Sequence, residues 1–234
     1  MMKSMLQKTI RAIFQLIYPK LCFACSKYPV LQDCSICISC QYKITPTNYH
    51  QLADNPVLER FWGRVELQHA SSSFEFIKGG LLQNLIHHLK YENRPEVGVE
   101  LGKMHGSRLV KTEPYNSVDF IIPVPLHAHR KHKRGYNQAA MFAEGLSISM
   151  RKTWTESHLI RTENTQTQTQ KSRIGRFENV EKAFEVVSPE RLRNKHLLLV
   201  DDVITTGATL EACAIKLLEV EGVKVSVVAI ALAG

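Results

Sequence analysis

The stretch LLLVDDVITTGATL, from Leu197 to Leu210, decides how this chain folds. It begins with four apolar residues, a pattern typical of a strand that is buried on both faces. Two carboxylates follow, Asp201 and Asp202, and then a run of small residues leads into a helical pattern. A turn at a helix N-terminus presents unpaired backbone N–H groups and the positive end of the helix dipole, which together predict a phosphate site. Because carboxylates accept hydrogen bonds from hydroxyl groups, the acidic pair beside this turn indicates a sugar phosphate as the ligand.

The turn itself consists of small residues, namely Thr205, Thr206, Gly207, Ala208 and Thr209. Gly207 permits a backbone conformation that a Cβ would obstruct, and threonine hydroxyls can donate hydrogen bonds to phosphate oxygens. The strand, the two acids and the T-T-G-x-T turn closely resemble the motif with which type I phosphoribosyltransferases bind phosphoribosyl pyrophosphate (PRPP). That resemblance implies that Asp201 and Asp202 hold the ribose hydroxyls and that the turn holds the 5′-phosphate.

Strand and helix patterns alternate along much of the chain. The helix that starts at this turn is followed by Gly222 and by an apolar strand over 223–232, which makes a strand–helix–strand unit. Such a unit places its two strands parallel in one sheet. Residues 120–126 predict another buried strand, and apolar periodicity predicts helices over 81–91 and 97–110. The sequence therefore predicts an α/β fold of the type I phosphoribosyltransferase kind, a parallel sheet flanked by helices.

Composition and charge limit the classes of function. The chain has 234 residues, of which 44% are apolar, and this suits one α/β domain plus a small module. The formal net charge of +8 favours anionic partners, such as phosphorylated small molecules or nucleic acid. The sequence has no apolar run of the ~18 residues that a transmembrane helix needs, and its N-terminus does not resemble a secretory signal. We therefore expect a cytoplasmic protein with no membrane span.

Most of the cysteines lie in a short N-terminal region and suggest a metal site. Two C-x-x-C pairs suit tetrahedral Zn²⁺, because each tight turn presents two thiolates. Cys34 also forms a C-x-x-C pair with Cys37, so the spacing leaves the ligand set open. We favour four ligands with Cys34 left over: Cys22, Cys25, Cys37 and Cys40. Metal-free structural thiols are the alternative, and a redox pair lacks a surrounding βαβ pattern. A module this small has little core, so zinc would supply much of its folding free energy.

The regions around the cysteines suggest how the chain divides. Apolar spacing predicts a short helix within residues 1–18. A zinc-ribbon-like module is expected over 19–48, followed by a linker with prolines and a serine run over 49–73. The phosphoribosyltransferase-like domain then covers 74–234.

Two polar segments carry cations suited to anionic ligands. The segment HAHRKHKR, residues 127–134, concentrates four permanent charges in an expected mobile loop, and a helix to about Met150 follows it. Such a loop either closes over a pyrophosphate group or grips a nucleic-acid backbone. After Leu159, Gln and Thr alternate without apolar partners, which predicts a second mobile loop before a short edge strand at 184–187.

Taken in order and spacing, the motifs resemble the ComF family over nearly the whole chain. They are the cysteine pairs, F-x-F-x-x-G-x-L followed by H-L-K-Y, then I-P-V-P-L, R-G-Y-N-Q, R-T-x-x-T-x-x-Q, R-x-x-N-V and the PRPP motif. The resemblance implies an N-terminal double zinc ribbon, a type I phosphoribosyltransferase domain and a link to DNA uptake in natural transformation. Cys34 departs from the family pattern and leaves open whether one or two zinc ions bind.

The resemblance also assigns roles by motif position. Arg134, Asn137 and Gln138 are expected on the pyrophosphate side of the PRPP site. A further set is expected to close over the ligand: Arg161, Thr165, Gln168, Arg173 and Asn179. The implied chemistry is displacement of pyrophosphate at the anomeric carbon of PRPP, with Mg²⁺ bridging pyrophosphate and ribose hydroxyls. The implied catalytic residues are Asp201, Asp202 and Arg134, and the sequence does not indicate the acceptor.

A second class of function stays open. A non-catalytic protein would use its zinc module and basic loops to bind single-stranded DNA or a helicase-like competence protein, and would keep the PRPP pocket as a sensor. A pure metal scaffold would leave the turn at 205–209 without a purpose.

Overall fold

The computed structural model describes residues 19–31, 33–162 and 183–233. The helix expected within 1–18 therefore lies outside the described residues. The same holds for four residues that the ComF resemblance places in a loop over the ligand, namely Thr165, Gln168, Arg173 and Asn179.

A five-stranded parallel sheet forms the centre of the molecule, as the sequence predicts. Its order is β1–β7–β6–β2–β3, and every neighbouring pair of strands runs parallel. The strands are β1 (His69–Glu75), β2 (Phe120–Pro123), β3 (Thr153–Trp154), β6 (His196–Ile204) and β7 (Lys224–Leu232). Parallel strands leave their carboxyl ends at one edge of the sheet, and in α/β folds that edge is where ligands bind.

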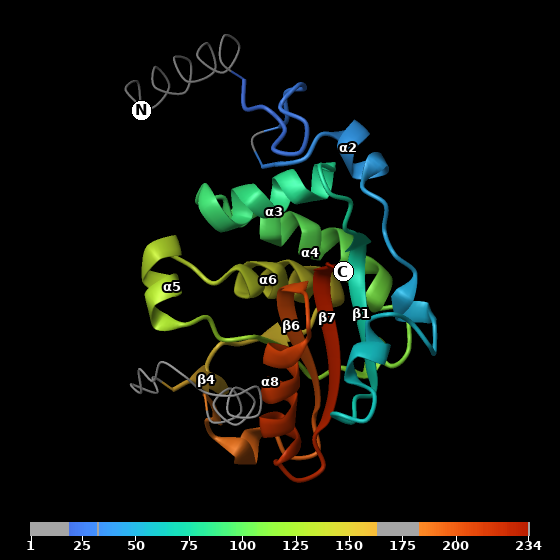
Figure 1. Cartoon of the computed structure of the whole chain (residues 1–234), viewed down its shortest axis with the longest axis vertical. Coiled ribbons are helices and arrows are strands. Elements are labelled where there is room, and N and C mark those ends of the chain that lie inside the picture. The colour runs from blue at the N-terminus through green and yellow to red at the C-terminus, as the bar shows by residue number, and fades with distance from the viewer. Residues whose placement is uncertain (1–18, 32, 163–182, 234) are drawn as a thin grey trace, which may run out of the picture.

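Helices cover both faces of the sheet, which explains why β6 and β7 are apolar along almost their whole length. They are α3 (Leu81–Tyr91), α4 (Pro95–Leu109), α6 (Gln138–Met150) and α8 (Ala208–Leu218). Alternate residues of β6 face opposite layers: Leu198 belongs to the core shared with α3, α4 and α6, and Leu199 to the core shared with α8. Figure 1 shows α8 against the sheet, with α3 and α4 stacked toward the N-terminal module. These facts confirm the predicted α/β architecture.

The cysteine-containing region packs on α3 and α4. It contains α2 (Ile38–Lys43) and a bridge between Leu21 and Pro29. From α4, the carboxylate of Glu100 accepts hydrogen bonds from the Ser35 backbone N–H (2.5 Å) and from Gln41 Nε2 (3.2 Å). The buried side chains of Cys22, Cys37 and Cys40 share one apolar core with the two helices. The cysteine-containing region is therefore packed together with the rest of the described protein.

The segment 49–73, expected as a linker, is built into the domain. It contains the short 3-10 helices η1 (Tyr49–Gln51) and η2 (Leu58–Phe61), and its last residues form most of β1. The polar sequence HASSSFE does not look like a buried strand, yet all of its residues except Glu75 are buried. Hydrogen bonds accommodate two of its three serine hydroxyls, since a buried polar group needs a partner. Ser73 Oγ donates to the Ala229 carbonyl (2.9 Å), and Ser71 Oγ accepts from the Tyr115 hydroxyl (2.8 Å). The Ser72 hydroxyl has no partner in the described part of the chain.

The first basic segment is also more ordered than the sequence suggests. Residues expected as a mobile loop form a short helix, α5 (Ala128–Arg134). Beyond it, β4 (Leu159–Arg161) pairs antiparallel with β5 (Phe184–Val186) in a separate two-stranded sheet, so the first residues of the expected polar loop form a strand. Most of that expected loop, 163–182, lies outside the described residues. Two further 3-10 helices, η3 (Tyr115–Ser117) and η4 (Pro189–Arg191), precede β2 and β6. Among the described residues, no helix has the length and apolar character needed to cross a membrane.

Candidate functional site

The acidic pair lies near the carboxyl end of β6, the central strand of the sheet. Both aspartates are partly buried, and each takes one hydrogen bond from the backbone that follows it. The N–H of Asp202 donates to Asp201 Oδ1 at 2.8 Å, and the N–H of Val203 donates to Asp202 Oδ1 at 2.6 Å. The strand end therefore holds two carboxylates in fixed positions at the carboxyl edge of the sheet.

The two aspartates differ in the charges that surround them. Lys90 of α3 forms an ion pair with Asp202, with Nζ 3.0 Å from Oδ2. Burial and the neighbouring charge of Asp202 raise the pKa of Asp201 to about 7, although the Asp202 N–H and Lys90 oppose this shift. Two carboxylates side by side resist double ionisation, so a cationic group or a metal ion at this edge would stabilise the charged pair.

The turn after β6 has the conformation that its sequence predicts. Gly207 adopts φ +79°, in the left-handed region that favours glycine, and directly precedes α8. A Cβ there would lie 3.2 Å from the ring of Phe61, so the backbone also packs closely on η2. Thr205 and Thr206 are exposed, and no hydrogen bond within the described part of the chain occupies the N–H of Thr206 or of Gly207. The turn thus presents free donors at the N-terminus of an eleven-residue helix.

The R-G-Y-N-Q motif contains three expected ligand residues, Arg134, Asn137 and Gln138, and they do not share one environment. Asn137 and Gln138 are buried, with exposed fractions of 4% and 1%. The side chain of Asn137 caps α6 by accepting from the Ala139 N–H and donates to the Val124 carbonyl, at 3.1 and 3.0 Å. Gln138 Oε1 accepts from Arg134 Nη1 at 2.8 Å. In this structure the asparagine and glutamine side chains point into the protein, and Arg134 is the member of the motif that lines a surface hollow.

That hollow is strongly basic. It is lined by Lys90, Tyr91, Asn93, His129, Arg130, Lys133 and Arg134. The guanidinium of Arg134 lies over the Tyr91 ring, 5.7 Å from its centroid. Lys90 joins the hollow to the acidic pair, because it lines the one and contacts the other. Lys90 belongs to the H-L-K-Y motif, but no role for it follows from the sequence, since none of its neighbouring residues indicates a contact with Asp202.

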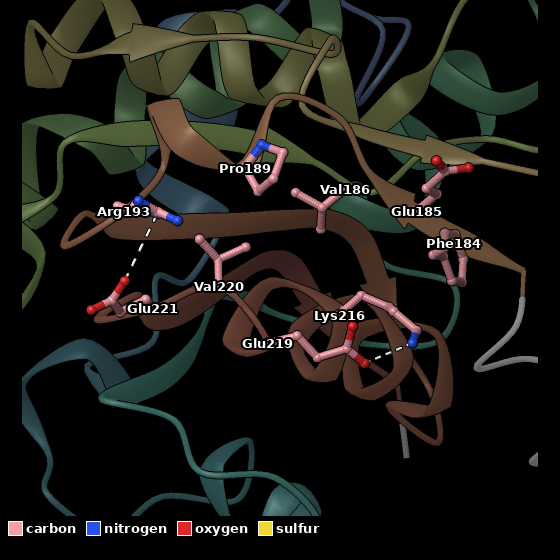
Figure 2. Close-up of a pocket in the computed structure, with 9 residues that line it drawn as sticks. All are labelled: Phe184, Glu185, Val186, Pro189, Arg193, Lys216, Glu219, Val220 and Glu221. Atoms are coloured by element: carbon pink, nitrogen blue, oxygen red, sulfur yellow. Dashed lines mark hydrogen bonds and ion pairs between the residues drawn. The ribbon is translucent and has the colours of Figure 1, made fainter.

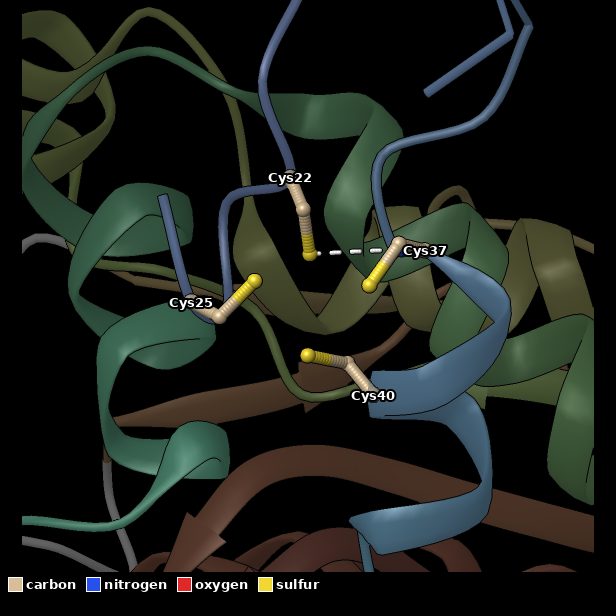
Figure 3. A group of neighbouring side chains, drawn as sticks. All are labelled: Cys22, Cys25, Cys37 and Cys40. Carbon is tan, nitrogen blue, oxygen red and sulfur yellow. Dashed lines mark hydrogen bonds between the residues drawn. The ribbon is translucent and has the colours of Figure 1, made fainter. Parts of the chain in front are cut away.

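The four favoured cysteines converge on one point. The sulfur atoms of Cys22, Cys25, Cys37 and Cys40 all lie within 4.8 Å of one another, and Figure 3 shows them directed toward a common centre. The Cys37 N–H donates to Cys22 Sγ at 3.2 Å, an arrangement that favours a thiolate. Tetrahedral zinc with Zn–S bonds near 2.3 Å needs sulfurs about 3.8 Å apart, so small side-chain adjustments would satisfy it. Cys34 is not part of this group.

A second hollow lies at the opposite end of α8 from the glycine turn (Figure 2). Both of its cations are paired with acids, Lys216 with Glu219 at 2.6 Å and Arg193 with Glu221 at 3.8 Å, and Glu185 adds a third carboxylate to the lining. Since the acids outnumber the cations, this hollow is poorly suited to a phosphorylated ligand. The candidate site is therefore the edge that holds the acidic pair, the glycine turn and the basic hollow.

Comparison with known proteins gives the class of this domain. Residues 137–233 match the family model described as "Phosphoribosyl transferase domain", which covers α6, the acidic pair, the glycine turn and β7. The parallel sheet and its flanking helices agree with that match. Residues 137–233 are thus similar to a phosphoribosyl transferase domain, in agreement with the PRPP-like motif.

Its relatives extend the resemblance beyond this domain. The DNA utilization protein YhgH of Escherichia coli K12 is 34% identical over 143 residues, which is 58% of this chain and 61% of that protein. Competence protein F of Haemophilus influenzae is 37% identical over 49% of this chain and 50% of its own length. Competence protein ComFC of Bacillus subtilis is 27% identical over 90% of this chain and 83% of its own length. The match spans about three fifths of the E. coli relative, and the chain is a homologue of these ComF-type proteins.

Proposed function

We propose that this chain is a ComF-like competence protein that binds PRPP together with Mg²⁺ at the carboxyl edge of its sheet. The observation that carries the proposal is that three complementary features share this edge: two aspartates for ribose hydroxyls, free turn N–H groups for the 5′-phosphate and a basic hollow for pyrophosphate. Lys90 connects the acidic and basic parts, which matches a ligand with hydroxyls at one position and phosphates on both sides.

The residues present fit the magnesium that such a ligand carries. Mg²⁺ prefers oxygen ligands, and the aspartate carboxylates supply them beside a cationic hollow. When bound with PRPP, the ion would spread the negative charge of pyrophosphate. Ribose or metal binding would compete with the Lys90–Asp202 ion pair, and Lys90 would then be free to contact the pyrophosphate.

If the domain is catalytic, the reaction is transfer of the phosphoribosyl group. The bond between the anomeric carbon and pyrophosphate breaks, a bond to the acceptor nucleophile forms, and the acceptor loses a proton. Asp201 and Asp202 would orient the ribose, while Arg134 and Lys90 would neutralise charge that develops on the departing pyrophosphate. The acceptor is not identified by the residues at this edge.

The cysteine cluster completes the proposal as a structural zinc site. Four thiolates with no place for a substrate are typical of structural rather than catalytic zinc. Clustered cysteines that bind a metal are typical of reducing compartments, which supports a cytoplasmic location.

Isothermal titration with PRPP and Mg²⁺ tests the proposal. The wild type should bind, and the Asp201→Asn/Asp202→Asn variant should lose at least about tenfold in affinity, because hydrogen bonds to charged groups are among the stronger ones. Glu190→Gln/Glu221→Gln is the matched control, since it removes two exposed carboxylates far from the turn. Absence of PRPP binding by the folded wild type would refute the proposal.

The basic hollow and the net charge of +8 favour one second candidate, binding of single-stranded DNA or of a helicase-like competence partner. The Asp201→Asn/Asp202→Asn variant and its control also distinguish this candidate from PRPP binding. Binding of a single-stranded oligonucleotide that weakens steeply with salt, and survives Asp201→Asn/Asp202→Asn, would support this candidate. If oligonucleotide binding is lost with PRPP binding, the two ligands share one site.

A further inference from the structure

Two arginines from the segment before β1, Arg60 and Arg64, hold the glycine turn. Arg60 Nη1 donates to the Thr205 carbonyl at 2.6 Å, and Arg64 Nη1 donates to the Thr206 carbonyl at 3.4 Å. Arg64 Nη1 also donates to the Arg60 carbonyl at 2.9 Å, so the two arginines are linked. Both lie outside residues 137–233, and the match to the domain family therefore does not account for them.

The contacts fix the direction of the peptide groups in the turn. In a planar trans peptide the C=O and the N–H of the same unit point in opposite directions. The Thr205 carbonyl shares its peptide with the Thr206 N–H, and the Thr206 carbonyl shares its peptide with the Gly207 N–H. Since the arginines hold the two carbonyls on one side, the two N–H groups point to the other side. These are the same N–H groups that have no partner in the described part of the chain.

The arginines are themselves well anchored. Between them, Phe61 is 1% exposed and packs on Gly207, so η2 is fixed against the turn. Asn55 Oδ1 accepts from the N–H groups of Val57 and Leu58, at 3.0 and 3.1 Å, and so fixes the start of this segment. Arg64 also forms an ion pair with Glu211 on the first turns of α8. Arg60 and Arg64, which we call the clamp, therefore contact both the turn and the helix that follows it.

We infer that Arg60 and Arg64 are positioning residues that preorganise the glycine turn for the phosphate of its ligand. They act from behind the turn, through its carbonyl groups, and do not contact the phosphate. Charge-assisted bonds to a carbonyl are stronger than neutral ones and polarise the peptide, which makes its N–H a better donor. This inference rests on the proposed sugar-phosphate site, and it makes the segment 55–64 part of that site.

Titration with two separate probes tests the clamp, because each probe occupies only part of the site. For Arg60→Gln/Arg64→Gln, affinity for ribose 5-phosphate should fall about tenfold or more, whereas affinity for Mg²⁺–pyrophosphate should stay within about twofold. Arg191→Gln/Arg193→Gln is the control, since it removes the same charge from two exposed positions near the second hollow. Loss of both probes to the same degree would point to general damage and overturn the inference.

Lysine variants separate geometry from charge. Arg60→Lys/Arg64→Lys keeps both charges but lacks the forked guanidinium, so it should restore ribose 5-phosphate binding only in part. Full restoration would show that charge alone matters and would contradict a positioning role.

A measurement without ligand keeps the clamp testable if neither probe binds. Amide hydrogen exchange should be faster in the glutamine variant for peptides that cover 205–212, where the N–H groups of Ala208 and Glu211 are hydrogen-bonded to the turn, and unchanged over 196–202 of β6 and in β7. Unchanged exchange at 205–212 would overturn the clamp. Failure of the wild type to bind either probe, with the exchange effect present, would instead reject the proposed sugar-phosphate function.

Discussion

At the scale of single residues, the adjacent aspartates at the end of β6 are the most consequential pair. Each could serve as a ribose ligand by sequence, but the structure makes them unequal, because Lys90 contacts Asp202 while burial and the Asp202 charge act on Asp201. Arg134 and its neighbours in the motif also differ: Asn137 and Gln138 point inward, so their contribution to a ligand site would come through α6 and Arg134.

The raised pKa of Asp201, about 7 against an ordinary value of 3.8, predicts a distinct pH dependence of stability. Between these two values the folded state binds more protons than the unfolded state, so the free energy of unfolding should decrease as pH rises from about 4 to 7. Asp201→Asn removes this effect. The variant should therefore gain more stability over the wild type at about pH 8 than at about pH 5, as measured by denaturant unfolding without ligand. An equal difference at both pH values would contradict the raised pKa.

At the scale of elements, the contact between α4 and α6 depends on glycines. A Cβ on Gly102 would lie 2.4 Å from the Phe142 carbonyl oxygen, and one on Gly145 would lie 2.1 Å from the Val99 carbonyl oxygen. Both obstacles are backbone atoms, which cannot move aside without separating the helices. The two helices therefore approach backbone to backbone, and this holds α4, with Glu100 and the cysteine module on it, close against α6.

Gly145→Ala tests that packing, because two effects oppose each other. Helix propensity alone would stabilise the alanine variant by about 1 kcal/mol. Overpacking against the Val99 carbonyl should outweigh this and destabilise the protein by about 1–3 kcal/mol net. Gly106→Ala is the graded comparison, since its Cβ would meet Ser149 Cβ at 3.0 Å and requires less movement. A stabilised Gly145→Ala variant in chemical denaturation would reject the close approach.

At the scale of the whole molecule, the cysteine module and the sheet domain form one packed unit. Buried Cys22, Cys37 and Cys40 belong to the same apolar core as residues of α3, α4 and α6. Removal of a metal from the module should therefore destabilise the molecule as a whole, because that core would lose packing on one side.

Elemental analysis and thermal unfolding measure this coupling. The purified protein should contain about one zinc per chain, and a chelator should lower the single unfolding temperature by several degrees. Cys40→Ser should reproduce that loss, whereas Cys34→Ser should keep both the zinc content and the stability, since Cys34 lies outside the cluster. A metal-free wild type with unchanged stability would exclude a structural zinc.

Features that depend on a local pattern of residues can be predicted from the sequence of this protein. The apolar runs of β6 and β7, the amphipathic period of α3, the glycine turn before α8 and the paired cysteines are all encoded within a few neighbouring residues, and the expected elements are present. Local patterns are reliable here because backbone conformation and burial of one face act over short stretches of chain. The strand β1 and the helix α5 were missed because HASSSFE and HAHRKHKR have neither an apolar period nor a buried face that can be read locally.

The distant residues that complete the candidate site, by contrast, become apparent only in the folded molecule. Arg60 donates to the carbonyl of Thr205, 145 positions further along the chain, and Lys90 on α3 contacts Asp202 on β6. Neither contact can be predicted from the neighbouring residues, because an arginine or lysine has the same sequence context whether it meets solvent or a distant acceptor. The physical reason is that contact between remote segments depends on sheet order and helix packing, which arise only when the whole chain folds.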